Sequence, residues 1–278
     1  SSHLHSFTHS ATEQLQMFCL RHTLSILSVT FTQATAHSNR LRSTNMASVT
    51  SRAALLGAPV TTPERLVEVE ERYGARELQI VKRHVLGKHE EGHRQFHVGG
   101  DRMGNQSGHH GFAPVYAAFI NRLRAQGVEP LAVAEVGVLK GTGLAIWSEI
   151  FNQSMIYGFD IDLSNYESNL QALKWKGFND SRVTVSTLDQ TEVDSTLLEH
   201  LFGSQRLSMV VDDGCHTVPC ANNTFLSFFP YLASRFLYFI EDTRHLDALL
   251  EEILHAHPEL NVTRAVGEQG FIHVISHL

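Results

Sequence analysis

The sequence predicts an α/β fold in which helices cover both faces of a mostly parallel sheet. Between residues 131 and 255, short runs rich in β-branched and aromatic residues alternate with stretches of helical periodicity. A glycine-rich turn follows the first of these runs, and the last two runs are joined by Gly267–Gly270 without a helix between them. Alternating strands and helices are typical of a parallel sheet. Two final strands joined by a short turn predict an antiparallel hairpin at one edge.

Composition excludes several classes of protein. The 278 residues are 42% hydrophobic, enough to bury one substantial core. A net charge of -7 and a pI of about 6.2 argue against nucleic acid or an anionic membrane as the main partner. No apolar run reaches the ~20 residues of a membrane-spanning helix. The three cysteines, Cys19, Cys215 and Cys220, are too few and too scattered for a disulfide framework, which favours a reducing compartment.

Residues 1–61 differ from the rest of the chain and are expected to be a disordered leader or targeting segment. Their only acid is Glu13, and they are rich in Ser and Thr, which resembles a transit peptide. A second interpretation takes Thr23–Phe31 as the apolar core of a signal peptide, followed by a small-residue pattern at Ala34–Ala36. In a third interpretation, the natural start is Met46 and the residues before it are leader sequence. The first places the protein in an organelle and the third leaves it cytoplasmic, and both are favoured over secretion.

Residues 62–127 are expected to form an N-terminal cap of helices and loops. Thr62 is a suitable N-cap and Pro63 suits the first helical position, so a helix should begin here. It is weakened at Gly74 and is expected to continue to His84.

Residues 88–111 are polar and rich in Gly and His, which predicts a loop. His89, His93 and His97 would share one face of a helix, but the glycines among them disfavour a helix, so a loop is preferred to a histidine metal site. The apolar spacing within Pro114–Arg124 predicts a second helix, ended by Gly127.

The remaining residues, 128–278, are expected to form a cofactor-binding domain that begins with a strand, a glycine turn and a helix. The valines of residues 133–138 suit a buried strand, and the helix is expected over Leu144–Phe151. A second strand, Met155–Phe159, ends at Asp160. Glycines allow a backbone to approach a ligand, and a carboxylate at the second strand tip can accept both hydroxyls of a ribose. The residues of interest are Glu135, Gly137, Gly141, Gly143 and Asp160.

The alternation continues to the end of the chain. Helices are expected over residues 166–175, 193–202, 218–232 and 246–255, and strands over 183–185, 207–211, 236–240, 262–266 and 271–276. Every strand from the second to the fifth has a carboxylate just after its tip, at Asp160, Asp189, Asp212–Asp213 and Glu241–Asp242. Because ligands collect at the carboxyl ends of parallel strands, these acids together predict a site.

Four motifs carry a more specific resemblance. They are Gly100–Arg102 with His110–Phe112 and Tyr116, then AEVGVLKGTGLAIW, then YGFDID, and finally VVDDGCHT followed by YFIED. Together they resemble class I S-adenosylmethionine-dependent methyltransferases, and within these the branch of macrocin O-methyltransferase and the cephalosporin-hydroxylase-like proteins. The resemblance implies a Rossmann-like, mostly parallel seven-stranded sheet with a C-terminal antiparallel hairpin and helices on both faces.

The resemblance also implies roles for single residues. Glu135, Gly137, Gly141 and Gly143 would surround the methionine part of S-adenosylmethionine, Asp160 would hold its ribose, and Asp189 would lie beside its adenine. Asp213 and Asp242 resemble ligands of a divalent metal, and His216 resembles a general base. Carboxylate oxygens suit Mg²⁺, and histidine can accept a proton near neutral pH. The plainer alternative is that His216 caps the following helix or bonds Asp212.

The chain departs from the family pattern at two positions. Cys215 stands where the family usually has Ser, and Arg244 stands where it tends to have His. A third metal ligand cannot be mapped, and Glu241 and Asp212 are candidates on proximity alone. The expected partner is a hydroxylated small molecule, such as a sugar or natural product, with homo-oligomerisation left open.

Two rival functions remain at the level of sequence. An NAD-dependent oxidoreductase would also use Asp160, which follows the glycines at the distance typical of dinucleotide folds. Ile146, however, falls at the third glycine of that motif, and the later acids would have no role. A non-catalytic cofactor-binding module would be favoured if Asp213, His216 and Asp242 did not converge.

Overall fold

The computed structural model describes residues 60–74, 78, 83–85, 88–90, 99–193 and 195–278. The three interpretations of the N-terminal segment therefore lie outside the described residues, apart from its last two positions. His93 and His97 lie outside them as well. Among the residues that are described, no helix is both long and apolar enough to span a bilayer.

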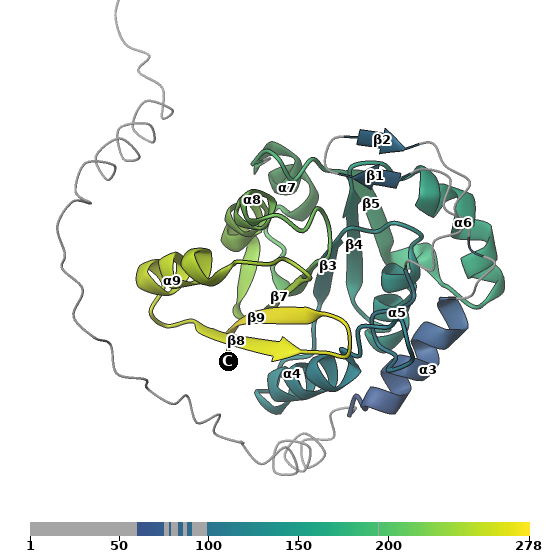
Figure 1. Cartoon of the computed structure of the whole chain (residues 1–278), viewed down its shortest axis with the longest axis horizontal. Helices are drawn as coiled ribbons and strands as arrows, with labels where there is room; N and C mark the ends of the chain where they lie inside the picture. The colour runs from purple at the N-terminus through teal and green to yellow at the C-terminus, as the bar shows by residue number, and fades with distance from the viewer. Residues whose placement is uncertain (1–59, 75–77, 79–82, 86–87, 91–98, 194) are drawn as a thin grey trace, which may run out of the picture. The chain divides into compact units, whose positions relative to one another are not determined.

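A seven-stranded sheet forms the centre of the molecule (Figure 1). Its strands in chain order are β3 (Ala132–Val136), β4 (Met155–Asp160), β5 (Val183–Thr187), β6 (Leu207–Asp212), β7 (Leu232–Glu241), β8 (Asn261–Val266) and β9 (Phe271–His277). Their spatial order is β5-β4-β3-β6-β7-β9-β8. The first five are parallel, while β9 runs antiparallel to both β7 and β8. The predicted fold class, including the C-terminal hairpin at the sheet edge, is confirmed.

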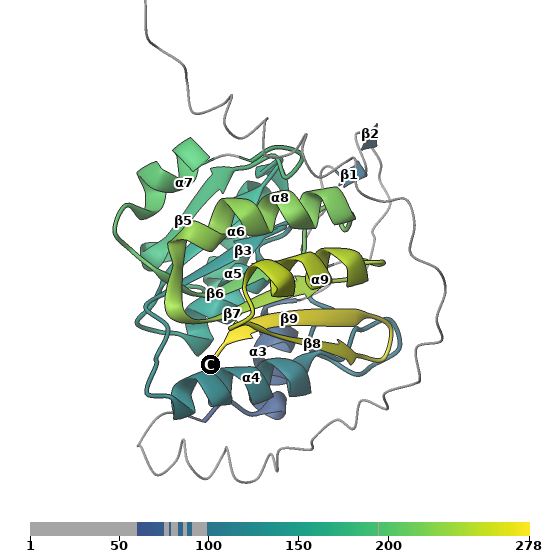
Figure 2. The same cartoon turned by 90° about the vertical axis from the view of Figure 1, so that its left-hand side faces the viewer.

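Helices cover both faces of this sheet (Figure 2). They are α3 (Pro63–Tyr73), α4 (Ala113–Ala125), α5 (Thr142–Ile150), α6 (Ser164–Trp175), α7 (Ser195–Phe202), α8 (Val218–Phe228) and α9 (Asp247–Ala256), with 3₁₀ turns at Asp180–Arg182 and Phe229–Tyr231. The first four pack on one face and the last three on the other. Alternate strand residues serve the two cores: Met209 and Val211 of β6 point to one, and Val210 points to the other.

The N-terminal helix is shorter than the sequence predicted. Thr62 caps α3 as expected, its hydroxyl accepting a hydrogen bond from the Arg65 N–H at 3.2 Å. The helix then ends at Tyr73 instead of His84, because the backbone of Gly74 packs directly against Gly100. Beyond it, β1 (Arg83–Val85) and β2 (Lys88–Glu90) pair as a separate antiparallel ladder, within a region predicted to be helix and loop.

The boundary between α8 and β7 also differs from the prediction. Helix α8 ends at Phe228, whereas residues 218–232 were expected to be helical. Pro230 follows two residues later and cannot continue an α-helix, because it lacks the N–H and its ring clashes with the preceding turn. The chain therefore enters β7 at Leu232, where it pairs with Leu207 of β6.

Candidate functional site

The carboxyl ends of the parallel strands bring the predicted site residues to one edge of the sheet. Strands β4, β3, β6 and β7 are neighbours in that order, so their tips lie side by side. Asp160 ends β4, Asp212 ends β6 and Glu241 ends β7. Asp213 and Asp242 follow directly after their strands, as the sequence predicted.

Gly137 brings the turn after β3 into contact with the loop after β6. Its φ is +92°, in the region that favours glycine. A Cβ at this position would collide with the backbone carbonyl of Asp213, while the Asp213 N–H donates to Val136 O at 2.9 Å. The glycine turn and the loop of Asp213 therefore form one packed unit.

Gly141 and Gly143 are also explained by contacts within the protein. Gly141 has φ +86° at the start of α5, and its Cα faces the ring of Tyr166. A Cβ at Gly143 would collide with the carboxylate of Glu135. Each glycine thus has a packing reason to be small, separate from its predicted role beside a cofactor.

Asp160 orders the same turn from the neighbouring strand. Its Oδ2 accepts the N–H of Leu139 at 2.8 Å, and its Oδ1 accepts the N–H of Asp162 at 3.1 Å. Burial raises the pKa of this carboxyl group. Each oxygen can accept a further hydrogen bond, and α5 begins nearby with no side-chain cap on its first N–H groups. These features fit a cofactor that has ribose hydroxyls and a charged head group.

Asp189 faces solvent, and the buried polar residue at this strand end is its neighbour Gln190. Asp189 Oδ1 accepts bonds from the N–H and hydroxyl of Thr191 at 2.9 and 2.7 Å. The amide of Gln190 donates to Asp212 Oδ1 at 2.7 Å and accepts from the Cys215 N–H at 2.8 Å. Sequence reasoning missed Gln190, which anchors the loop that carries Asp213 and His216.

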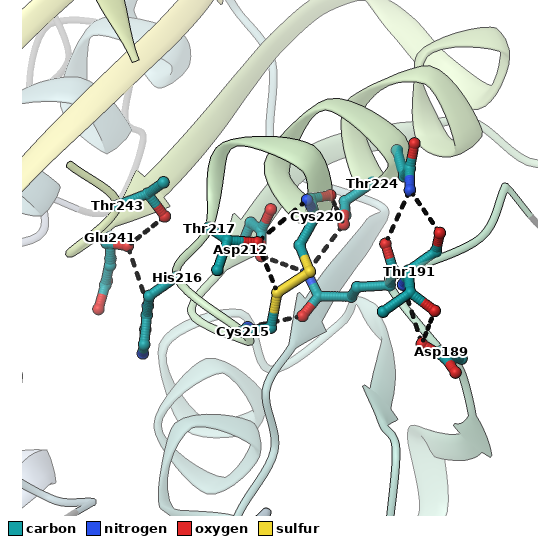
Figure 3. The surroundings of a disulfide bond; sticks show 12 residues. Asp189, Thr191, Asp212, Cys215, His216, Thr217, Cys220, Thr224, Glu241 and Thr243 are labelled. Carbon is teal, nitrogen blue, oxygen red and sulfur yellow. Dashed lines mark hydrogen bonds between the residues drawn. A yellow bond between two sulfur atoms is a disulfide. The ribbon is translucent and has the colours of Figure 1, made fainter. Parts of the chain in front are cut away.

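His216 lies between the two acidic loops. Its Nδ1 is 3.3 Å from the backbone oxygen of Glu241, a contact that Figure 3 shows. Its Nε2 is 3.9 Å from Asp213 Oδ1. The N-cap of α8 is Thr217, whose hydroxyl accepts from the Cys220 N–H. The plainer role of His216 as a helix cap is therefore taken by its neighbour. Its imidazole is 42% exposed and can reach a ligand.

Arg102, to which the sequence assigned no role, connects three of these strand ends. Its side chain is buried and forms ion pairs with Glu135 at 2.7 Å, Asp213 at 2.8 Å and Glu241 at 3.0 Å. The other oxygen of Glu241 accepts a hydrogen bond from the Tyr116 hydroxyl. Burial raises the pKa of Glu241 to about 8, against the lowering effect of Arg102.

Asp242 has a basic partner of its own. His110 Nδ1 lies 3.1 Å from Asp242 Oδ2, and its Nε2 lies 3.9 Å from Asp101 Oδ2. Bonding to Asp242 raises the pKa of His110 to about 9. The motif His110–Phe112 is thereby brought to the end of β7, although it stands more than 100 residues earlier in the chain.

The donor set suits a hard divalent cation in type, because it consists of carboxylate oxygens. Within the described ranges, no three His, Cys, Asp or Glu side chains already converge as a metal site. One oxygen each of Asp213 and Asp242 is turned toward Arg102 and His110. The carboxylates of Asp101, Asp213 and Asp242 lie beside Arg102 and His110. Such oxygens are typical ligands of Mg²⁺.

Cys215 and Cys220 form a disulfide across the start of α8 (Figure 3). The cysteines were expected to be too few and too scattered for a disulfide framework; one pair is nonetheless bonded, which removes the support that the cysteines gave to a reducing compartment. Cys19 lies outside the described residues.

We expect loss of this disulfide to lower the free energy of unfolding by about 2 kcal/mol, since a bond between residues so near in sequence closes only a short loop. The test is urea unfolding of the wild type and Cys215→Ser, each with and without dithiothreitol. Dithiothreitol should destabilise the wild type and leave the variant unchanged. Equal responses, or free thiols at both Cys215 and Cys220 of the untreated native protein by mass spectrometry, would contradict the pairing.

Comparison with known proteins gives one curated sequence relative and several solved structures of low sequence identity. No family model matches the sequence. Demethylmacrocin O-methyltransferase of Streptomyces fradiae is 27% identical over 138 residues, which are 48% of this chain and 32% of the relative. The chain thus spans about a third of the relative's length.

Two solved structures are similar at low identity. MycE methyltransferase from the mycinamycin biosynthetic pathway, in complex with Mg, SAH and mycinamycin VI, has 21% identity and a TM-score of 0.48, covering 80% of this chain and 57% of its own. A putative O-methyltransferase from Klebsiella pneumoniae has 17% identity and a TM-score of 0.46, covering 84% and 99%. The curated relative confirms, over about half of this chain, the sequence resemblance to the macrocin O-methyltransferase branch of the class I methyltransferases.

Proposed function

We propose that the chain is an S-adenosylmethionine-dependent O-methyltransferase that, assisted by Mg²⁺, acts on a hydroxyl group of a small molecule, such as a sugar or natural product. The observation that carries the proposal is the contact between Gly137 and the backbone of Asp213. It sets the cofactor turn directly against the loop that carries the candidate base, as a transfer between two adjacent ligands requires. The name of the curated relative supports the same reaction type.

Each predicted residue has a role in this proposal. Glu135, Gly137, Gly141 and Gly143 border the methionine part of the cofactor, Asp160 accepts from the ribose, and Asp189 lies on the adenine side. The cofactor supplies an electrophilic methyl group. His216 takes the proton from the acceptor hydroxyl, and Asp213, whose Oδ1 is 3.9 Å from His216 Nε2, stabilises the imidazolium that results.

Asp213 and Asp242 are the proposed ligands of Mg²⁺. When bound, this ion would make an acceptor hydroxyl more acidic. Glu241, a third candidate by proximity, has both carboxylate oxygens occupied by Arg102 and Tyr116. Glu241 is therefore better suited to supporting the site than to binding the ion directly. Asp212 Oδ1 accepts from Gln190, but its buried Oδ2 has no hydrogen-bond partner among the described residues, so Asp212 stays a candidate third ligand.

The two rival functions make different demands on the site. An NAD-dependent oxidoreductase leaves Asp213, His216 and Asp242 without a task and requires a glycine where α5 has the buried Ile146. A non-catalytic module would bind the cofactor and never consume it.

The proposal is tested by isothermal titration calorimetry with S-adenosylmethionine, S-adenosylhomocysteine and NADH. We expect saturable binding of the first two and none of NADH. Asp160→Ala should weaken S-adenosylmethionine binding by tenfold or more, because a carboxylate that accepts ribose hydroxyls is lost. Asp180→Ala, at a distant 3₁₀ turn, is the matched control. Binding of NADH alone would overturn the proposal. Cofactor binding without S-adenosylhomocysteine release, over a panel of hydroxylated acceptors, would favour the non-catalytic module.

A further inference from the structure

Arg102 uses all three guanidinium nitrogens on carboxylates from three neighbouring strand ends. Nη1 lies 2.7 Å from Glu135 Oε1 of β3, Nη2 lies 2.8 Å from Asp213 Oδ2 after β6, and Nε lies 3.0 Å from Glu241 Oε2 of β7. The side chain is 9% exposed and those of Glu135 and Glu241 are each 2% exposed, so these pairs are screened little by water. One buried cation therefore joins the proposed cofactor turn to the proposed metal carboxylate.

The backbone that carries Arg102 is itself held in place. Glu70, buried on α3, accepts the N–H of Arg102 at 2.9 Å with one oxygen. Its other oxygen accepts the N–H groups of Met103 and Gly104 at 2.8 and 3.0 Å. The indole ring of Trp147 lies 5.7 Å from the guanidinium carbon. Helices on one face of the sheet thus fix where the guanidinium group sits.

This arrangement divides the two oxygens of Asp213 between different tasks. Oδ2 is bound by Arg102, so Oδ1 is the oxygen left on the side of His216, at 3.9 Å. The Asp213 side chain is 28% exposed, whereas those of Glu135 and Glu241 are buried. Without Arg102 the Asp213 carboxylate would be free to rotate, and the buried Glu135 and Glu241 would lose their cationic partner.

We propose that Arg102 is a positioning residue, which orients Asp213 for the metal ion and transmits cofactor binding to it through Glu135. The inference rests on the proposed function, since it concerns the same cofactor and metal. Groups that orient a metal ligand typically contribute 10- to 100-fold to metal affinity. Lysine would keep the charge, but a single ammonium group cannot span three carboxylates in the way the planar fork does.

The test measures Mg²⁺ affinity of the full chain by calorimetry, with and without saturating S-adenosylhomocysteine. In the wild type we expect S-adenosylhomocysteine to strengthen Mg²⁺ binding about fivefold or more. Arg102→Lys should weaken Mg²⁺ binding about 10- to 100-fold and bring the ratio of the two affinities close to one. A purely structural role would change the melting temperature without removing this ratio. A folded Arg102→Lys with wild-type affinity and ratio would overturn the inference.

Glu135→Gln keeps the test decisive if Arg102→Lys does not fold. The amide has the shape of the carboxylate but no charge, so it breaks the connection on the cofactor side only. We expect it to abolish the ratio at S-adenosylhomocysteine concentrations that calorimetry shows to saturate the variant, and a preserved ratio would overturn the coupling. Asp213→Asn distinguishes an error in the proposed metal ligand from an error in the role of Arg102. If it binds Mg²⁺ like the wild type, the proposed metal ligand is wrong; if it alone loses affinity, only the role of Arg102 is wrong.

Discussion

Exchanging His216 for asparagine is expected to lower turnover by about 10²- to 10⁴-fold, the range that a positioned general base contributes. The affinity for S-adenosylmethionine should stay close to that of the wild type, because His216 lies on the acceptor side of the turn in the proposed function. Asparagine is the suitable replacement because His216 has φ +55°, a conformation that asparagine tolerates better than most residues. The measurement is S-adenosylhomocysteine release with an acceptor that the wild type methylates.

The matched control is His200→Asn, an exposed histidine in the last turn of α7. It should leave turnover within about twofold of wild type. Because Thr217, not His216, caps α8, both variants should also unfold at wild-type urea concentrations. Turnover of His216→Asn within tenfold of wild type would remove this residue as the base.

Gly137→Ala is expected to cost about 4 kcal/mol of folding free energy, a loss at the upper end for single substitutions. The new methyl group would collide with the backbone oxygen of Asp213, which cannot rotate away as a side chain can. The positive φ of Gly137 adds a conformational cost of about 1–2 kcal/mol. Urea unfolding followed by circular dichroism measures the total.

Gly127→Ala separates the two costs. Gly127 also has a positive φ, +76°, but nothing lies within 4 Å of a Cβ at that position. It should therefore show the conformational cost alone, about 1–2 kcal/mol. Equal losses in the two variants would mean that the close approach to Asp213 does not contribute to stability.

The strand ends could be predicted because they depend on local periodicity. Asp160, Asp213 and Asp242 come at the ends of apolar runs that form parallel strands of one sheet, so the sheet places them all at its carboxyl end. Gln190 could have been found by the same rule. Leu188 and Gln190 are buried while Asp189 between them is exposed, which is the alternation of an extended chain.

The contacts of Arg102 could not be predicted in this way. Arg102 and Glu241 are 139 positions apart, and Arg102 lies in a polar, glycine-rich stretch that has no periodicity. Its position depends on Glu70, which accepts three backbone N–H groups from that stretch. A buried glutamate on an otherwise amphipathic helix is visible only once packing is known. The same limit explains the early end of α3, which depends on contact with Gly100.

The contact between Gly137 and Asp213 implies that the glycines are constrained by folding, whereas His216 is constrained only by its proposed catalytic role. A descendant that had lost its cofactor would still need glycine at 137, 141 and 143, because the loop of Asp213, the ring of Tyr166 and the carboxylate of Glu135 occupy the space of a side chain. Selection for folding alone would therefore preserve the glycine signature. His216, partly exposed and not a helix cap, has no such structural protection. An active enzyme and an inactive paralogue should thus differ first at His216, while their glycine turns remain alike.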